Sequence, residues 1–153
     1  MIELKRILLP TDFSEHSEHA LRYAREFAEL FDAELHILHV LRKLSAPERG
    51  LAFMPPGDLA LDVRPAAERR LRKMADDERS EGRTIVSEIR EGHPFVEIVR
   101  GADESESDLI VMGTHAWGRI SHLLIGSVAE KVVRKAHCPV LTIRPEGHEF
   151  VLP

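Results

Sequence analysis

The residues best suited to bind a small anion lie between an apolar run and an amphipathic pattern, within residues 110–133. The apolar run ends at Gly113, a polar loop follows, and Gly126-Ser127 then precedes apolar residues at helical spacing. Glycines at the two ends of such a loop let the backbone approach a phosphate, and the N–H groups at a helix start attract negative charge. The Ser127 hydroxyl could add a further donor. The stretch predicts a phosphate-binding loop, although glycines also serve simply to turn a chain.

Asp12 is a second candidate, because it directly follows the first predicted strand, residues 3–11. A carboxylate at this place could accept a hydrogen bond from a ribose or a base, or hold a metal-bound water. A structural role explains it equally well, since Asp12 or Ser14 could cap the following helix. Ser127 has the same alternative, because Ser127 and Glu130 have the spacing of a capping box. The residues alone leave both alternatives open.

The elements that must position these residues alternate along the chain. Short apolar runs predict strands at residues 3–11, 34–41, 84–89, 108–112 and 139–143. Apolar residues at helical spacing predict helices at 17–31 and 66–80, and two more that begin at Pro94 and Ser127. Residues 42–64, with several prolines and glycines, are predicted to form a long flexible loop. The alternation predicts a single α/β domain over residues 1–153, in which an open parallel sheet binds ligands at the carboxyl ends of its strands.

The composition argues against several classes of protein. A net charge of −5 argues against broad nucleic-acid binding, for which a basic face would supply most of the affinity, and no apolar run reaches the roughly 20 residues that span a bilayer. The single cysteine, Cys138, suits a reducing compartment, so we expect a cytoplasmic protein. The histidines do not group with cysteines or carboxylates, so we expect no metal site made of protein side chains. A phosphate site in such an acidic chain must depend on backbone dipoles, local cations and a divalent metal.

Four segments, in this order, make the chain resemble the universal stress protein family over essentially its whole length: ILLPTDFSEHSEHAL, DLIVMGTH, LLIGSVAEKVVR and HCPVLTIRP. The resemblance implies an α/β fold with strand order 3-2-1-4-5 and a homodimer formed through the last strand. Family members that bind ATP carry the pattern G-x2-G-x9-G-[ST] in the loop described above. Here Gly113, Gly126 and Ser127 match the pattern, and Ala116 stands where the second glycine is found.

The resemblance also implies a role for each matching residue. Pro10, Thr11, Asp12 and Val40 would bind the adenosine part of ATP, with the backbone of Val40 recognising adenine. The residues that line the ribose and the phosphates would be Met112, Gly113, His115, Ala116, Gly126, Ser127, Val128 and Ala129. A Mg or Mn ion would bridge the phosphates without being held by protein side chains.

The resemblance implies a regulatory module of the stress response that binds an adenine nucleotide and acts on an unknown protein partner. Two alternatives remain open at this stage. One is a slow ATP hydrolase, for which no general base or transition-state lysine is evident in the sequence. The other is a dimeric interaction protein that does not bind ATP, for which Ala116 would be the trace.

Overall fold

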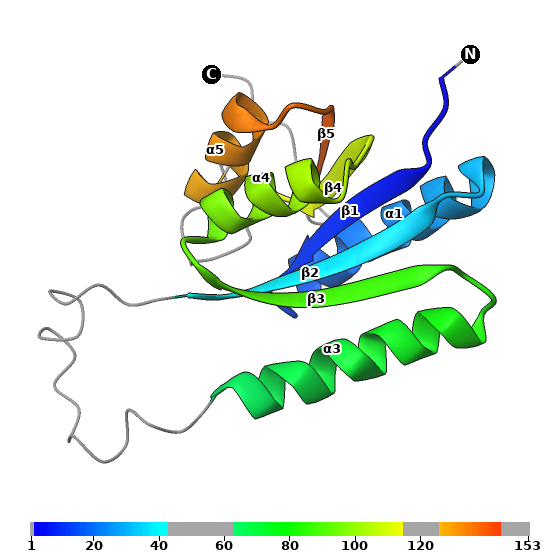
Figure 1. The fold of residues 1–153 in the computed structure, drawn as a ribbon, viewed down its shortest axis with the longest axis horizontal. Helices are drawn as coiled ribbons and strands as arrows, with labels where there is room; N and C mark the ends of the chain where they lie inside the picture. The colour runs from blue at the N-terminus through cyan, green and yellow to red at the C-terminus, as the bar shows by residue number, and fades with distance from the viewer. Residues whose placement is uncertain (1, 43–62, 115–125, 145–153) are drawn as a thin grey trace, which may run out of the picture.

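The computed structural model describes residues 2–42, 63–114 and 126–144. Its centre is a five-stranded parallel sheet with the order β3-β2-β1-β4-β5 (Figure 1). The strands are β1 Arg6–Thr11, β2 Glu34–Arg42, β3 Ile85–Gly92, β4 Leu109–Gly113 and β5 Val140–Ile143. The predicted doubly wound α/β fold and its strand order 3-2-1-4-5 are therefore confirmed.

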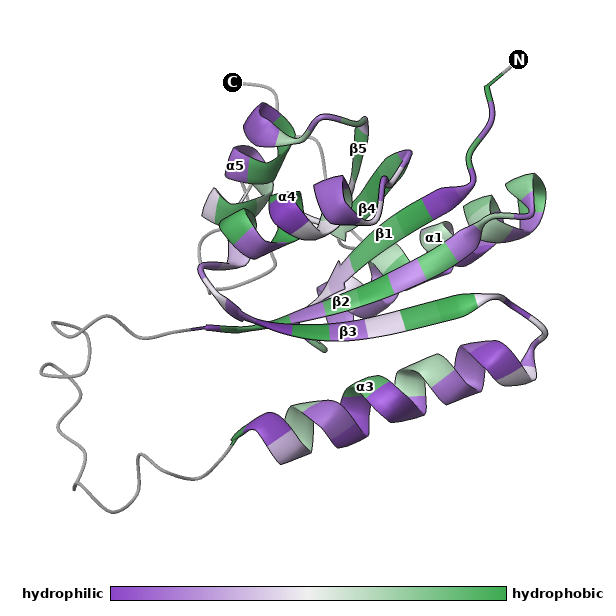
Figure 2. Ribbon diagram, viewed as in Figure 1, coloured by the Kyte–Doolittle hydropathy of each residue, from purple (hydrophilic) through white to green (hydrophobic). Residues whose placement is uncertain are grey.

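Helices cover the sheet on both faces and create two separate cores. The helices are α1 Glu15–Phe31, α3 Val63–Ser80, α4 Pro94–Glu104 and α5 Ser127–Lys135. One apolar core joins α1 and α3 to the sheet, and the other joins α4 and α5 to its opposite face. Because β1 is covered from both sides, Ile7, Leu8 and Leu9 are all fully buried, as expected for a central parallel strand. Figure 2 shows the contrast between the mainly hydrophobic β1 and the mainly hydrophilic α3.

Element boundaries differ from the predicted ones where side chains cap an end. The first strand begins at Arg6 and not at residue 3, because the Asp108 carboxylate accepts the backbone N–H groups of Lys5 and Arg6 at 2.7 and 2.9 Å. Helix α1 begins at Glu15, two residues early, because the Ser14 hydroxyl caps it by accepting from the Ser17 N–H at 3.3 Å. Pro94 stands in the first turn of α4, as predicted.

The predicted loop at 42–64 is shorter at both ends than expected. Arg42 belongs to β2, and α3 already begins at Val63. Residues 43–62 lie outside the described residues, so their predicted flexibility remains a prediction. Within the described ranges, no helix combines the length and the apolar character needed to cross a membrane.

Candidate functional site

The predicted adenosine residues lie at the carboxyl ends of neighbouring strands. From β1 the chain adds β2 and β3 on one side, and it then adds β4 and β5 on the other side. The strand order therefore switches beside β1, and doubly wound sheets bind ligands at such a switch. Pro10 and Thr11 end β1 and are buried, and Thr11 is opposite His39, so Val40 lies one residue beyond the end of β1. Val40 and Met112 are buried residues at 1% and 0% exposure, and their side chains belong to the core that α4 and α5 cover.

Asp12 lies in the turn between β1 and α1 and already has a structural role there. Its Oδ1 accepts the backbone N–H of Ser14 at 3.0 Å and also the Ser14 hydroxyl. Ser14 is the N-cap of α1, so Asp12 supports the residue that caps the helix. Of the two structural alternatives for this turn, the cap is therefore Ser14. This role does not conflict with ligand binding, because Asp12 is only partly buried.

His39 lies directly under this turn, on the face of the sheet that α1 and α3 cover. Its Nδ1–H donates to the Thr11 carbonyl at 2.8 Å, and its ring lies 4.4 Å from the Phe13 ring. Burial lowers the pKa of His39 below its ordinary value, although the Thr11 carbonyl and the Asp12 carboxylate favour the charged form. The imidazole is therefore neutral at pH 7, and its hydrogen bond to Thr11 fixes the end of β1.

Two backbone hydrogen bonds bring the start of α5 to the end of β4. The Thr114 N–H donates to the Ile143 carbonyl at 3.0 Å, and the Gly126 N–H donates to the Thr114 carbonyl at 2.7 Å. Residues 114 and 126 are thus adjacent, although eleven residues separate them in the chain. His115 and Ala116 lie in that stretch, outside the described residues. The remaining residues of the predicted phosphate site lie together at one edge of the sheet.

Gly113 has a packing role that the sequence did not indicate. A Cβ at this position would lie 3.0 Å from the carbonyl oxygen of His16 and 3.2 Å from its carbonyl carbon. The close approach that requires a glycine here is therefore between β4 and the first turn of α1. An approach of Gly113 to a phosphate stays a prediction, but it is no longer needed to explain the glycine.

The predicted capping box at Ser127 is wrong. The N-cap of α5 is Gly126, which has no side chain to cap the helix, and Ser127 is the first helical residue. Glu130 instead pairs with Arg134 at 2.9 Å, one turn further along the helix. The physical reason is the bond from Gly126 to Thr114, which fixes the chain one residue earlier than the box requires.

A glycine N-cap has no side-chain oxygen that could accept the N–H groups of the first helical turn. Those N–H groups belong to Ser127, Val128 and Ala129. The side chain of Ser127 is exposed, whereas those of Val128 and Ala129 are in the core at 8% and 0% exposure. This end of α5 can therefore offer backbone N–H groups, one hydroxyl and the positive end of the helix dipole to an anion.

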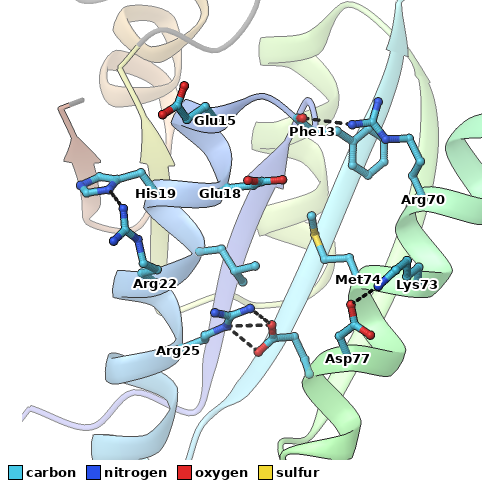
Figure 3. A pocket seen from close by; sticks show the side chains of 12 residues that line it. Phe13, Glu15, Glu18, His19, Arg22, Arg25, Arg70, Lys73, Met74 and Asp77 are labelled. Carbon is cyan, nitrogen blue, oxygen red and sulfur yellow. Dashed lines mark hydrogen bonds and ion pairs between the residues drawn. The ribbon is translucent and has the colours of Figure 1, made fainter. Parts of the chain in front are cut away.

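A separate cavity of about 570 Å³ lies between α1 and α3 (Figure 3). Phe13, Leu21 and Met74 give it apolar lining, and charged residues of both helices form its walls. Glu78 of α3 and Arg25 of α1 close one end with a bidentate ion pair. This cavity is on the α1 side of the sheet and does not include Val40, Gly113 or Ser127.

Glu78 is the residue that the sequence analysis missed. Charged residues outnumber apolar ones along the predicted helix at 66–80, which is typical of a surface helix, yet the Glu78 side chain is only 1% exposed. The signal was present, since Ala67, Leu71, Ala75 and Glu78 follow helical spacing and all four are buried. The part of the chain that the structure describes contains no group of three or more histidine, cysteine, aspartate or glutamate side chains that could hold a metal ion.

Comparison with known proteins gives the same assignment over nearly the whole chain. The model of the universal stress protein family matches residues 3–144. Universal stress protein MJ0531 of Methanocaldococcus jannaschii is 36% identical over 148 residues, covering 95% of this chain and 85% of the relative. The solved structure of protein MJ0577 from the same organism has a TM-score of 0.80 at 30% identity, covering 95% of this chain and 99% of that chain.

A universal stress protein from Archaeoglobus fulgidus, solved in complex with dAMP, has a TM-score of 0.63 at 26% identity and covers 94% of this chain and 99% of its own. The family match and the 36% identical relative both extend over the strands and the helices that bring Asp12, Gly113 and Ser127 to one edge. The chain therefore belongs to the universal stress protein family.

Proposed function

We propose that the chain is a cytoplasmic regulatory module of the stress response that binds ATP, with Mg or Mn, at the carboxyl edge of its sheet. The observation that carries the proposal is the start of α5 at a glycine N-cap, which the 2.7 Å bond from the Gly126 N–H to the Thr114 carbonyl holds at the end of β4. A helix start without a side-chain cap leaves donors for a phosphate. The dAMP complex of a related protein supports an adenine nucleotide as the ligand.

In this proposal each part of the nucleotide is bound by a different group of residues. Asp12, with Pro10 and Thr11, contacts the ribose side, and the backbone of Val40 pairs with adenine. The N–H groups of Ser127, Val128 and Ala129 bind the phosphates, together with the Ser127 hydroxyl. A Mg or Mn ion bound with the nucleotide would supply positive charge that offsets the phosphates, and no protein side chain is proposed to hold it. Met112, Gly113, His115 and Ala116 complete the wall of the site.

A thermal denaturation series with Mg-ATP tests the proposal. At a ligand concentration of about 100 times Kd, binding should add about 2.7 kcal/mol to the free energy of unfolding. Mass spectrometry of the purified protein should also find adenine nucleotide carried through purification. No thermal shift at millimolar Mg-ATP, together with no carried nucleotide, would favour the alternative of an interaction protein without ATP binding. In that case Ala116→Gly, which restores the family pattern, should create binding.

We also propose that the chain forms a homodimer through β5. The carbonyls of Pro139 and Ile143 accept hydrogen bonds from Ile110 of β4 and from Thr114, the residue after β4, at 3.0 Å each. Alternation along a parallel ladder therefore turns the N–H groups of Val140 and Thr142 outward. β5 is the last strand of the sheet, and this outward row would pair with a second copy across a two-fold axis.

Thr142→Pro should convert the dimer to a monomer, because proline removes one outward N–H and leaves the bonds to β4 intact. Light scattering on the size-exclusion peak at micromolar concentration measures the change. Thr142→Val, which keeps the N–H, should stay dimeric. A wild-type chain that is already monomeric at this concentration would contradict the proposed dimer.

A further inference from the structure

The turn that carries Asp12 contains a backbone conformation that needs support. Phe13, the next residue, has φ of 61°, in the left-handed region. An aromatic residue with a Cβ is disfavoured there, and such conformations persist only where surrounding contacts impose them. Strained positions of this kind are concentrated at binding sites, and this one adjoins the carboxylate proposed to contact the nucleotide.

Contacts from three different elements hold Phe13 in place. Its N–H donates to the Thr11 Oγ1 of β1 at 3.0 Å, and its carbonyl accepts from the Arg70 guanidinium of α3 at 3.2 Å. Its ring lies between the His39 ring of β2, at 4.4 Å, and the Arg70 guanidinium, at 4.6 Å. Figure 3 shows Arg70 reaching from α3 across to Phe13. The arginine thus makes both a hydrogen bond and a cation–π contact with one residue.

The residue on the other side of Asp12 is fixed as well. The Thr11 carbonyl accepts from His39 at 2.8 Å, and the Thr11 hydroxyl donates to the Ser17 hydroxyl at 3.1 Å. Asp12 therefore lies between two residues whose backbones are held by neighbours. The direction of its carboxylate follows from that backbone and from the hydrogen bonds that Ser14 donates to it.

We propose that Arg70 and Phe13 are positioning residues of the nucleotide site: Arg70 holds Phe13 in the left-handed conformation, and this conformation directs the Asp12 carboxylate to the nucleotide. The inference rests on the proposed function. It makes α3 part of the site's support, although Arg70 is 57 residues from Phe13 in the sequence. A change in α3 would reach the nucleotide through the two contacts that Arg70 makes with Phe13.

Calorimetric titration of Mg-ATP into the full chain tests the inference. Arg70→Met keeps the aliphatic stem and removes the charge and the donors, so ATP should bind about tenfold more weakly, a loss typical of one such contact. Arg70→Lys keeps a cation over the ring and should recover part of the affinity. Arg69→Met, at the exposed neighbouring position of α3, is the matched control and should bind like the wild type.

A second measurement separates positioning from a general loss of stability. Amide hydrogen exchange should become faster at Phe13 and Ser14 in Arg70→Met, while the amides of β1 keep their protection. Phe13→Gly should weaken ATP binding too. Glycine permits the left-handed backbone, but it lacks the ring through which His39 and Arg70 hold that conformation. Wild-type affinity in Arg70→Met, or unchanged exchange at these two amides, overturns the positioning role alone. A wild-type chain that does not bind Mg-ATP overturns the proposed function, and the positioning role with it.

Discussion

Replacing Asp12 by alanine should remove most of the stabilisation that Mg-ATP gives to the wild-type chain. A hydrogen bond to a charged group is worth about 1.5–3 kcal/mol, which corresponds to a loss of affinity on the order of 100-fold. At a ligand concentration that gives the wild type about 2.7 kcal/mol, the variant should then gain only about 0.4 kcal/mol. Thermal denaturation with and without Mg-ATP measures the difference, and calorimetry gives the two affinities directly.

Two further variants separate the ligand contact of Asp12 from its role in the turn. Asp12→Asn keeps an oxygen that can accept the Ser14 N–H but loses the charge, so its affinity for Mg-ATP should fall between those of the wild type and Asp12→Ala. Ser14→Ala removes the cap of α1 and should cost about 1 kcal/mol without ligand, while most of the ATP effect remains. Wild-type affinity in Asp12→Ala would mean that this carboxylate serves only the turn.

The fold class was predictable because the central strands are short, continuous apolar runs. A run such as Ile7-Leu8-Leu9, with no polar alternation, fits only a strand buried on both faces, and all three residues are fully buried. The strand order came from the family resemblance, because apolar runs alone do not say which strands are neighbours. Boundaries were the weaker part. β1 begins at Arg6, where the Asp108 carboxylate accepts the N–H groups of Lys5 and Arg6, and Asp108 is about 100 residues away in sequence.

The candidate site was predictable only as far as local patterns decide it. The ends of β1 and β4 follow from the strands that precede them, so Asp12 and Gly113 were correctly expected at one edge. The capping box at Ser127 failed because a distant partner, Thr114, fixes Gly126 and so sets where α5 begins. No pattern near Gly113 indicates the His16 carbonyl that excludes a side chain there.

The least predictable contacts join α1 to α3, and the main one is the ion pair between Arg25 and the buried carboxylate of Glu78. Its side chain is 1% exposed and accepts two hydrogen bonds from Arg25 Nε, at 2.7 and 2.8 Å. Arg83 is its second partner and donates a hydrogen bond at 3.2 Å. Hydrogen bonding to Glu78 raises the pKa of Arg25, against the opposing effect of its partial burial. The cluster thus combines one buried negative charge with two arginines from different parts of the chain.

Glu78→Gln should lower the free energy of unfolding by about 3 kcal/mol, because it removes the counter-charge of Arg25 and leaves Arg83 paired with Glu29 alone. The size of the loss depends on rehydration, since the Arg25 side chain is 37% exposed and can turn toward water, whereas that of Arg83 is only 16% exposed. Urea denaturation measures the change, and an unchanged m-value would show that the fold is kept.

Asp77→Asn is the matched control: its partner Lys73 is exposed, so the denaturation midpoint should hardly move. The double variant Arg25→Gln with Glu78→Gln should recover part of the loss, because it removes one unpaired charge; strict additivity of the two single losses would contradict a coupled pair and assign the effect to packing alone.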